Sequence, residues 1–377
     1  MAMHDVVVTG VGIVSCAGES IEAHLEALVS KAQPKTDGDM FPSYWIHPVG
    51  AVEYDKQIPK KSDQRQMEPW QRLGVYAAGL ALDSAGVKED VELKHNMHLI
   101  VAAGGGERDY AVDGQILTGM RDAANPGAYL NERLMNDIRP TLFLAQLSNL
   151  LAGNISIVHG VTGASRTFMG EEACGIDAIR IAHGRIRAGQ TDSILVGGSY
   201  NAERPDALLI HEMGGYLWKK PFRSVWERDA EGGGFVLGSG GAFIMLESRE
   251  HAEKRGATIM AKLEAVSSDR SVRTSGSVKK ALTKAWNDVG ATASATVFSG
   301  ATGVAGITAE EQKALSGLAS NGKIHALGDL VGHTIEAQTT MGAVLGAAQI
   351  HKGDINEAVV TMVGHRRGEG ALRLVKA

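Results

Sequence analysis

Two stretches far apart in this chain repeat one pattern. Residues 178–198 and 342–364 each contain a helix-like segment ending in Ile-X-X-Gly, a short polar link and an apolar strand ending in Gly. Ile186 and Gly189 in the first copy match Ile350 and Gly353 in the second. A duplicated α/β unit with a boundary near residues 250–260 would explain this echo. Chance would also explain it, because α/β proteins reuse such units, and the echo alone favours neither explanation.

Helix-like and strand-like segments alternate along the rest of the chain. Residues 6–9 form a β-branched run, after which Gly10 and Gly12 predict a tight turn. Apolar residues at helical spacing predict one helix over 64–85 and another over 175–188. Short apolar runs predict strands at 97–102, 193–196 and 243–246. This alternation favours an α/β protein with largely buried strands.

Composition excludes several classes of protein. Hydrophobic residues are 44 % and charged residues 21 % of the 377 positions, which excludes a disordered, collagenous or coiled-coil chain. No apolar stretch approaches the roughly 18 residues of a membrane helix, and the N-terminus lacks the basic segment of a signal peptide. The net charge of −5 argues against nucleic acid as the main partner. Two cysteines, Cys16 and Cys174, are too few for a disulfide framework, so we expect a cytoplasmic protein.

Neither the glycine-rich segments nor the histidines follow the pattern of a ligand site. The runs at 10–12 and 104–106 follow strand-like segments, but neither completes G-x-G-x-x-G, and the chain has no Walker lysine motif. Tight turns explain them better than a nucleotide site. The 13 histidines show no metal-ligand spacing, so we expect no metal.

The stretch VHGVTGASRTFMGEEACGIDAIRIAHGRIRAGQTDSILVGG (158–198) resembles the nucleophile region of the β-ketoacyl-acyl-carrier-protein synthases. Gly163, Gly175 and the pair Gly197-Gly198 match that family's glycines without a gap. Four more segments follow the family in order: DVVVTGVGIVS (its first strand), DAEGGGFVLGSGGAFIMLESREHAEKRGA (its Asp-x-x-x-x-Gly-Phe segment), Ser299-Gly300 (its His-Gly-Thr) and VGHTIEA (its Gly-His-x-x-Gly-Ala). The resemblance implies an α/β thiolase-like fold with a duplicated five-layered αβαβα core. Its two halves would be residues 1–255 and 256–377, which would also account for the echo.

The positions that carry the family's chemistry are changed. The match places Glu172 at the nucleophilic Cys and Ser299 at the first catalytic His, and only His333 is kept. The family's Lys before Gly-His is absent, since residues 326–331 read Ala-Leu-Gly-Asp-Leu-Val. Its gating Phe-Gly-Phe reads Gly364-His365-Arg366-Arg367.

One branch of the family is closer than the others. Residues 170–178, Gly-Glu-Glu-Ala-Cys-Gly-Ile-Asp-Ala, look like the Gly-Glu-Gln-Ala-Gly-Gly-Leu-Asp-Ala segment of chain-length factors. Those proteins are nucleophile-free partners of active ketosynthases in type II polyketide systems. They have Gln where this chain has Glu172.

Physical chemistry supports the loss of condensation activity. A condensing enzyme carries its acyl chain on a thiolate at a helix N-terminus. Glu172 suits the helix dipole, but it is a poor acyl carrier, and at about 4 Å it would repel a malonyl carboxylate by roughly 1–4 kcal/mol. Ser299 supplies one hydrogen bond without the strength or pKa of an imidazole. We therefore interpret Glu172, Ser299 and His333 as degenerate catalytic positions.

Other interpretations of these residues stay open. Cys174 is the alternative nucleophile, although a shift of two residues moves a side chain several ångströms where such sites tolerate about 0.5 Å. A buried structural cysteine is the simpler interpretation. His333 alone is more often a hydrogen-bonded structural histidine than a catalyst. Glu171 fits a structural carboxylate at a helix start or a subunit contact.

A carrier-protein contact is implied by a basic segment. IPKKSDQRQMEPWQRLGV (58–75) resembles the family helix that binds acyl carrier protein, a small acidic protein whose phosphopantetheine arm brings the substrate. Lys60, Lys61 and Arg65 match its basic positions, and Arg72 follows two helical turns later. Residues 218–223 form a second basic stretch. The alternative is an ordinary solvated helix and loop. We expect no cofactor beyond that substrate arm.

The resemblance implies a β-ketoacyl synthase-like protein of fatty acid or polyketide biosynthesis. We expect a chain-length-factor-type subunit that forms a heterodimer with an active ketosynthase paralogue and shapes its acyl tunnel, although a homodimer can also form in isolation. Phe168 and Met169 are candidate tunnel residues, with plain core as the alternative. One alternative function is an active 3-oxoacyl synthase or malonyl decarboxylase that uses Cys174 or Glu172. Another is a non-catalytic module that binds acyl carrier protein or lipid.

Overall fold

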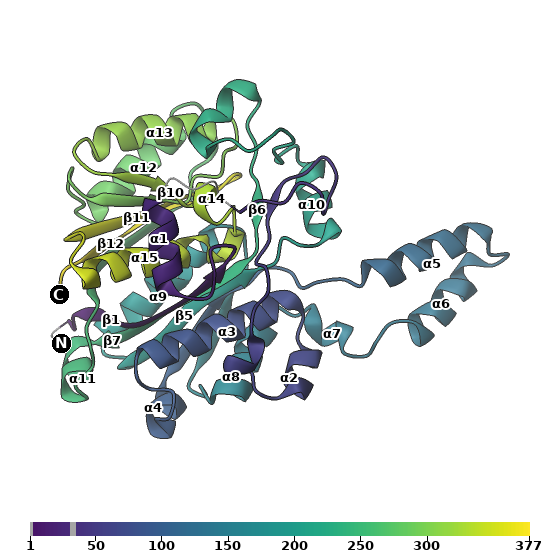
Figure 1. Cartoon of the computed structure of the whole chain (residues 1–377), viewed down its shortest axis with the longest axis horizontal. Helices are drawn as coiled ribbons and strands as arrows, with labels where there is room; N and C mark the ends of the chain where they lie inside the picture. The colour runs from purple at the N-terminus through teal and green to yellow at the C-terminus, as the bar shows by residue number, and fades with distance from the viewer. Residues whose placement is uncertain (1–2, 31–34) are drawn as a thin grey trace.

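The strands of the computed structural model, which describes residues 3–30 and 35–377, belong to two sheets (Figure 1). The strands of the large sheet are β1 (Val6–Ser15), β3 (His98–Ala102), β4 (Ser165–Phe168), β5 (Ser193–Tyr200), β7 (Gly240–Ser248), β8 (Ala261–Asp269), β9 (Thr296–Ser299), β10 (Ile324–Ala326), β11 (Glu357–Val363) and β12 (Glu369–Val375). Their order is β10-β9-β11-β12-β8-β1-β7-β5-β3-β4. A small parallel pair joins β2 (Ile46–His47) to β6 (Leu237–Gly238).

The large sheet consists of two copies of one five-stranded arrangement. The order β1-β7-β5-β3-β4 is repeated as β8-β12-β11-β9-β10, with two antiparallel pairings followed by two parallel ones in each copy. The copies meet where β1 pairs with β8 at Val7–Lys262 and Val8–Ala261. The echoing segments fall on equivalent units, α9 (Ala173–Arg187) with β5 and α15 (Gln338–Lys352) with β11. Duplication therefore explains the echo.

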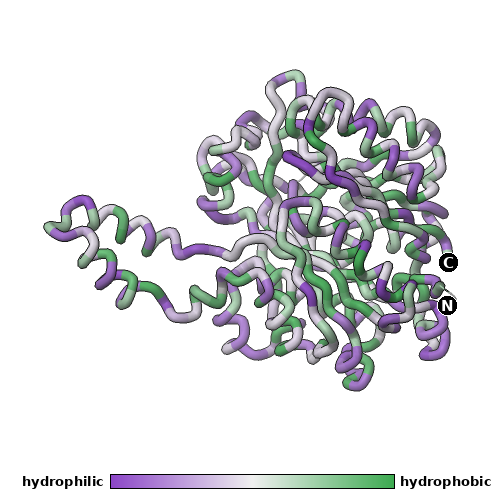
Figure 2. Tube along the Cα trace, turned by 180° about the vertical axis from the view of Figure 1, so that it is seen from behind, coloured by the Kyte–Doolittle hydropathy of each residue, from purple (hydrophilic) through white to green (hydrophobic). Residues whose placement is uncertain are grey.

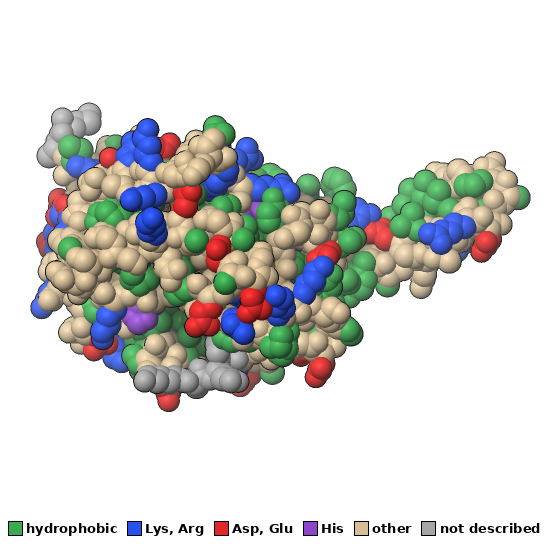
Figure 3. Space-filling view, turned by 90° about the horizontal axis from the view of Figure 1, so that it is seen from above, with side chains coloured by type: hydrophobic (Ala, Val, Ile, Leu, Met, Phe, Trp, Pro, Cys, Tyr) green, Lys and Arg blue, Asp and Glu red, His purple; other side chains and the backbone are tan. Residues whose placement is uncertain are grey.

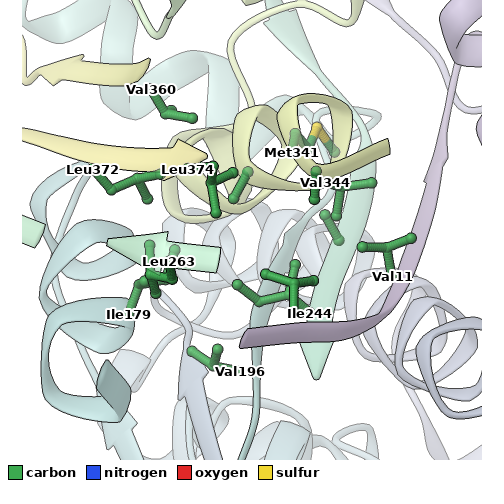
Figure 4. Close-up of a cluster of buried hydrophobic side chains, with 14 of the residues drawn as sticks. Val11, Ile179, Val196, Ile244, Leu263, Met341, Val344, Val360, Leu372 and Leu374 are labelled. Atoms are coloured by element: carbon green, nitrogen blue, oxygen red, sulfur yellow. The ribbon is translucent and has the colours of Figure 1, made fainter. Parts of the chain in front are cut away.

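Helices and sheet halves alternate in five layers. Between the two halves lie α9 and α15, whose apolar side chains share one buried cluster with both halves (Figure 4). On the outer face of the first half lie α3 (Pro69–Ser84) and α8 (Leu150–His159), and on that of the second lie α12 (Ser277–Asp288) and α13 (Ile307–Leu318). The predicted αβαβα core is confirmed.

The remaining helices lie outside this five-layered core. They are α1 (Ile21–Val29), α2 (Lys61–Gln66), α4 (Val91–Asn96), α5 (Tyr110–Asp122), α6 (Pro126–Asn136), α7 (Leu142–Ala145), α10 (Pro205–Met213), α11 (Arg249–Lys254) and α14 (Leu327–Leu330), with 3₁₀ turns η1 (Tyr54–Lys56), η2 (Val225–Glu227), η3 (Asp229–Glu231) and η4 (Ile335–Ala337). Helices α5 and α6 form an arm that projects from the body (Figures 1 and 2). Among the described residues, no helix is long and apolar enough to cross a membrane.

Gly10 and Gly12 do not form the predicted turn, because both lie inside β1. Helix α3 crosses this strand so closely that a Cβ on Gly10 would lie 2.4 Å from the Ala81 carbonyl oxygen. A Cβ on Gly12 would lie 2.2 Å from the Ala77 carbonyl oxygen. The glycines therefore serve helix–strand contact, which a local turn pattern cannot reveal.

The single helix predicted over 64–85 is also wrong, because the segment forms two helices. Helix α2 ends at Gln66, and α3 begins at Pro69 with Glu68 and Gln71 in a reciprocal capping box. Proline lacks an N–H and suits the first turn of a helix, so it starts a new helix here. Arg65 and Arg72 consequently lie on different helices. The predicted boundary at 255/256 falls between α11 and β8 and stays a prediction.

Candidate active site

Glu172 is fully buried at the N-terminal end of α9. Its Oε1 accepts hydrogen bonds from His333 Nε2 and His365 Nδ1, both at 2.8 Å. Burial by itself would raise the pKa of Glu172, but the hydrogen bonds from His333 and His365 outweigh it and hold the pKa well below its usual range. The position that the sequence match assigns to the nucleophile therefore carries a buried carboxylate.

The site is assembled from segments that are distant in sequence. His333 precedes η4, and His365 lies in the loop between β11 and β12. The Phe235 ring packs against both, with centroids 5.0 Å from His333 and 5.6 Å from His365. Tyr216 lies edge-on to His365 at 4.6 Å. His333 and His365 are 1 % and 3 % exposed, so the described conformation encloses the site.

A second carboxylate covers the outer side of His365. Glu171 Oε1 lies 3.8 Å from His365 Nε2 and 3.4 Å from Arg366 Nη1. The Arg366 guanidinium lies 5.6 Å above the Tyr216 ring. Glu171 thus ties the start of α9 to the β11–β12 loop.

Glu171, Glu172 and His365 have ligand-type atoms within 4.8 Å of one another, as a metal site would require. The two nitrogens of His365, however, face different carboxylates: Nδ1 faces Glu172 and Nε2 faces Glu171. One ring cannot direct both nitrogens at one ion, and the cationic Arg366 adjoins Glu171. The arrangement fits a hydrogen-bonded chain better than a metal centre, and the absence of a metal stays a prediction.

Cys174 is placed as a structural residue. Its side chain is buried, and its Sγ lies 3.7 Å from the Gly170 carbonyl oxygen. Burial, followed by the charges of Glu336 and Glu172, raises the pKa of the thiol well above its usual value. Since the thiolate is the nucleophilic form, this environment disfavours Cys174 as a displaced nucleophile.

The Ser299 side chain forms its hydrogen bonds with Glu311 and Ala301 rather than with Glu172. Its hydroxyl donates to Glu311 Oε1 at 2.7 Å and accepts from the Ala301 N–H at 3.1 Å. Burial raises the pKa of Glu311 to about 7. No hydrogen bond joins Ser299 to Glu172 or His333 within the part of the chain that the structure describes. Of the three predicted catalytic positions, the structure therefore brings Glu172 and His333 into contact and leaves Ser299 outside their hydrogen bonds.

The segment before Gly332-His333 carries no basic side chain at the family's Lys position, since residues 326–331 include no Lys or Arg. Leu327 belongs to the central hydrophobic cluster. A Cβ on Gly328 would lie 3.0 Å from Val225 Cγ1 and 3.3 Å from the Ala301 carbonyl oxygen, so a longer side chain would have to displace its neighbours.

Sequence reasoning missed Phe235, His365, Glu311 and Glu336 as members of this region. Phe235, His365 and Glu336 lie in segments that resemble the family. His365 belongs to the segment that replaces the family's gating Phe-Gly-Phe, and Glu336 stands where the family has a Gly. Those departures were the available signal. Nothing in the sequence marked Glu311, because its contact with Ser299 depends on the placement of α13 against β9.

Most of the predicted carrier-protein residues surround one surface cavity. Lys61, Arg65 and Arg72 line a cavity of about 350 Å³ together with Arg139, while Lys60 lies outside its lining. Arg139 pairs with Glu68, another lining residue. Lys61 in turn pairs with Asp55, so Arg65 and Arg72 are the lining cations without an ion pair among the described residues, and these two suit an anionic partner.

The second basic stretch is compensated by carboxylates. Lys219 pairs with Glu212, while Lys220 and Arg223 both lie 3.0 Å from carboxylate oxygens of Glu231. Its charges are therefore less available to an acidic partner.

The two predicted tunnel residues lie in different environments. Phe168 is half-buried and packs against the central cluster. Met169 is 70 % exposed, so it lines no enclosed passage within this chain alone.

Comparison with known proteins gives a consistent result. The family model described as "Beta-ketoacyl synthase, N-terminal domain" matches residues 3–252. The chain is 26 % identical over 272 residues to 3-oxoacyl-[acyl-carrier-protein] synthase 2 of Vibrio cholerae, covering 70 % of this chain and 62 % of that protein. It is 27 % identical over 259 residues to the tetracenomycin polyketide synthase ketoacyl synthase beta subunit of Streptomyces glaucescens, covering 67 % of this chain and 60 % of that one. The match thus spans less than two thirds of each relative.

A solved structure extends the likeness to the whole chain. The ishigamide ketosynthase/chain length factor superposes with a TM-score of 0.81 at 20 % identity, covering 100 % of both chains. This likeness confirms the thiolase-like fold.

Proposed function

The chain belongs to the β-ketoacyl synthase family, and we propose that it is a catalytically degenerate, chain-length-factor-type subunit. It would pair with an active ketosynthase in fatty acid or polyketide biosynthesis and shape the acyl tunnel. The observation that carries this proposal is the buried Glu172 carboxylate, held by His333 and His365 where the family has its nucleophilic Cys.

That arrangement opposes condensation in two ways. A carboxylate anion does not form the thioester on which the family's chemistry depends. His333 and His365 also direct hydrogen-bond donors at Glu172, and a donor committed there does not stabilise a developing enolate or oxyanion on a substrate. We infer that the chain's role lies in what it contributes to a partner.

Exposed apolar side chains support pairing with a second thiolase-fold chain. Many of them lie on the arm, on α7 and on α10: Leu117, Leu134, Met135, Phe143, Leu144, Leu209, Ile210 and Met213. Met135 is 77 % and Phe143 69 % exposed. Figure 3 shows hydrophobic side chains over the projecting arm. Surfaces of this kind mark protein–protein contacts.

The sheet itself also offers a pairing edge. Strand β4 lies at the end of the sheet order, next to β3, and its other edge is open within the described structure. An open strand edge is a template for pairing with another chain. We propose an active ketosynthase paralogue as the occupant, as in the ketosynthase/chain length factor pair, with a second copy of this chain as the alternative.

We propose acyl carrier protein as the partner of the basic cavity. Lys61, Arg65, Arg72 and Arg139 would attract its acidic surface, with Lys60 at the margin. The phosphopantetheine arm of that protein would be part of the substrate, and the chain would need no cofactor of its own. A cytoplasmic location is part of the same proposal.

Co-expression with the nearest ketosynthase of the same genome tests this function. The complex is purified through a tag on this chain alone and assayed for elongation with malonyl- and acyl-carrier proteins. We expect a 1:1 complex that elongates, a chain that is inactive by itself, and a complex whose elongation largely survives Glu172→Gln or Glu172→Ala in this chain.

The opposite results separate the alternatives. Elongation by this chain alone, abolished by Cys174→Ala, would show that the nucleophile has moved. Release of CO₂ from malonyl carrier protein by the chain alone would support a decarboxylase. Binding of acyl carrier protein without any ketosynthase partner would support a binding module.

A further inference from the structure

Glu336 occupies a space surrounded by glycines beside the nucleophile position. A Cβ built on Gly104, which follows β3, would lie 2.2 Å from Glu336 Oε1. Cβ atoms on Gly175 of α9 and Gly198 of β5 would lie 2.7 Å and 3.4 Å from the Glu336 carbonyl oxygen. Gly175 is three residues after Glu172. Gly175 and Gly198 thus admit the main chain of residue 336, whatever its side chain, while at Gly104 it is the Glu336 carboxyl group that fills the space.

This carboxyl group is buried without the partners that a charge needs. Glu336 is 4 % exposed, and its Oε2 has no hydrogen-bond partner among the described residues. Burial raises the pKa of Glu336 to about 8, and the nearby charge of Glu172 adds to this effect. The charge of Arg204 lowers the pKa of Glu336, but Arg204 is itself paired with Asp206 at 3.0 Å. Burial therefore favours the neutral acid form of Glu336.

The backbone before Glu336 is strained. Ile335 has a φ of +44°, a region that a β-branched residue seldom adopts. Its side chain is buried in a small apolar cluster with Phe235 and Leu237. Strain of this kind persists where surrounding packing imposes it and concentrates at functional sites. The packing of Ile335 thus helps to hold Glu336 in its buried position.

In the family motif that VGHTIEA resembles, Gly-His-x-x-Gly-Ala, position 336 is a glycine. Glycine there would leave free the volume that the Glu336 side chain now fills beside Gly104. The outer side of residue 172 is covered by His365 and the β11–β12 loop. An acyl chain held at residue 172 therefore needs the inner side, where the Glu336 side chain lies against Gly104.

We propose that Glu336 is a specificity-determining residue that closes this inner space, so that the chain's own site excludes acyl chains. The inference rests on the proposed function, because it takes an acyl thioester as the substrate class. A filled and polar inner space opposes an alkyl chain both by volume and by leaving a buried carboxyl beside apolar carbon. An acyl chain delivered to the complex would then occupy only the partner's site.

Binding of a soluble acyl thioester to the purified full-length chain tests this proposal. The probe is the decanoyl thioester of N-acetylcysteamine, which is uncharged, and binding is followed by isothermal titration calorimetry. Glu336→Gly opens the space, while Glu336→Gln keeps its volume without the acid. We expect Glu336→Gly to bind the probe about tenfold or more tightly than the unmodified chain, because burying two CH₂ groups alone changes affinity by that factor. Glu336→Gln should behave like the unmodified chain.

Two controls make the result specific. The acetyl thioester of N-acetylcysteamine has the same head group without the alkyl chain, so Glu336→Gly should not improve its binding. Far-UV circular dichroism and the melting temperature show whether the variant is folded, and Glu336→Ala takes its place if it is not. The proposal is overturned if the unmodified chain binds the decanoyl probe as tightly as the opened variant, or if no folded opened variant gains affinity.

This experiment is independent of the pairing experiment. A gain of affinity in Glu336→Gly without any ketosynthase complex would keep the inference and remove the proposed partnership. An elongating complex whose Glu336→Gly chain gains nothing would keep the partnership and remove the inference.

Discussion

His365 Nδ1 lies 2.8 Å from Glu172 Oε1 although the two residues are 193 positions apart. The pair joins the residue that the family resemblance assigns to the nucleophile position to one that it assigns to the gating segment. With His333 on the same oxygen, it makes the centre of the site a buried, hydrogen-bonded anion. Both departures from the family pattern thus meet in one contact, which favours a coordinated change over independent loss.

Replacing Glu172 should destabilise the protein. Glu172→Ala removes the shared acceptor and leaves the donors of His333 and His365 buried and unpaired, which should lower the free energy of unfolding by about 2–4 kcal/mol. Glu172→Gln keeps the shape and one acceptor oxygen, so it should cost less. Urea denaturation measures both changes. Glu171→Ala is the control, since its partner Arg366 is exposed and the loss should stay below about 1 kcal/mol. Equal effects at 171 and 172 would contradict the described network.

The buried acids should make stability depend on pH in opposite directions. The pKa of Glu172 is lowered on folding, so its contribution is present above its unfolded pKa of about 4.5 and is lost as the pH falls through the folded value. Burial raises the pKa of Glu311 to about 7 and that of Glu336 to about 8. These two acids therefore favour the folded state most below about pH 4.5, and stability falls as the pH rises through their folded values.

Glu311→Gln tests the alkaline side of that dependence. It removes the ionisation and keeps an acceptor for Ser299, so it should raise the free energy of unfolding by about 1–3 kcal/mol at about pH 9 relative to pH 5. Melting temperatures across this range measure the effect. Glu89→Gln, at an exposed position, should leave the pH profile unchanged. A profile that Glu311→Gln also leaves unchanged would show that Glu311 ionises normally.

Cys174 should react slowly in the native protein. Burial raises the pKa of its thiol, so iodoacetamide at about pH 8 should modify it far more slowly in the folded chain than in urea. Mass spectrometry of the Cys16→Ala variant follows Cys174 alone. Rapid labelling of the folded chain would instead support Cys174 as a displaced nucleophile.

Charge reversal in the basic cavity should weaken carrier-protein binding. Arg65→Glu and Arg72→Glu should each lower the affinity for acyl carrier protein by about tenfold at low salt, with a smaller effect at high salt. Fluorescence anisotropy with labelled carrier protein measures this. Lys220→Glu is the matched control, because Lys220 is already paired with Glu231. A stronger effect at Lys220 would move the docking site to the second basic stretch.

Polar substitutions on the arm should prevent pairing. Leu117 and Met135 are 64 % and 77 % exposed, and Leu117→Asp or Met135→Asp should reduce co-purification of the ketosynthase at least about tenfold, since each places a charge in a desolvated contact. Val91→Asp is the control, because Val91 is 75 % exposed on α4 rather than on the arm. If all three variants co-purify equally well, the arm is not the contact.

Local patterns were sufficient for most of the architecture. The alternating segments and the helix that follows Glu172 depend on neighbours a few residues away, so local patterns predicted the α/β class. The echo between 178–198 and 342–364 left duplication and chance open, and the family resemblance implied the duplicated unit. The family resemblance, rather than a local pattern, placed Glu172 at the nucleophile position and His333 at the retained one. Local patterns misplaced Gly10 and Gly12, because the role of these glycines depends on α3, some seventy residues away.

The state of the site was decided by contacts that no local pattern records. Only the tertiary structure brings His365 to Glu172, turns Ser299 toward Glu311 and places Glu336 against Gly104. Each of these contacts joins different segments, and the ionisation of each acid depends on the burial and the partners created there. The sequence by itself determined which chemical groups the site contains, while packing between distant segments decided which are charged, paired or enclosed.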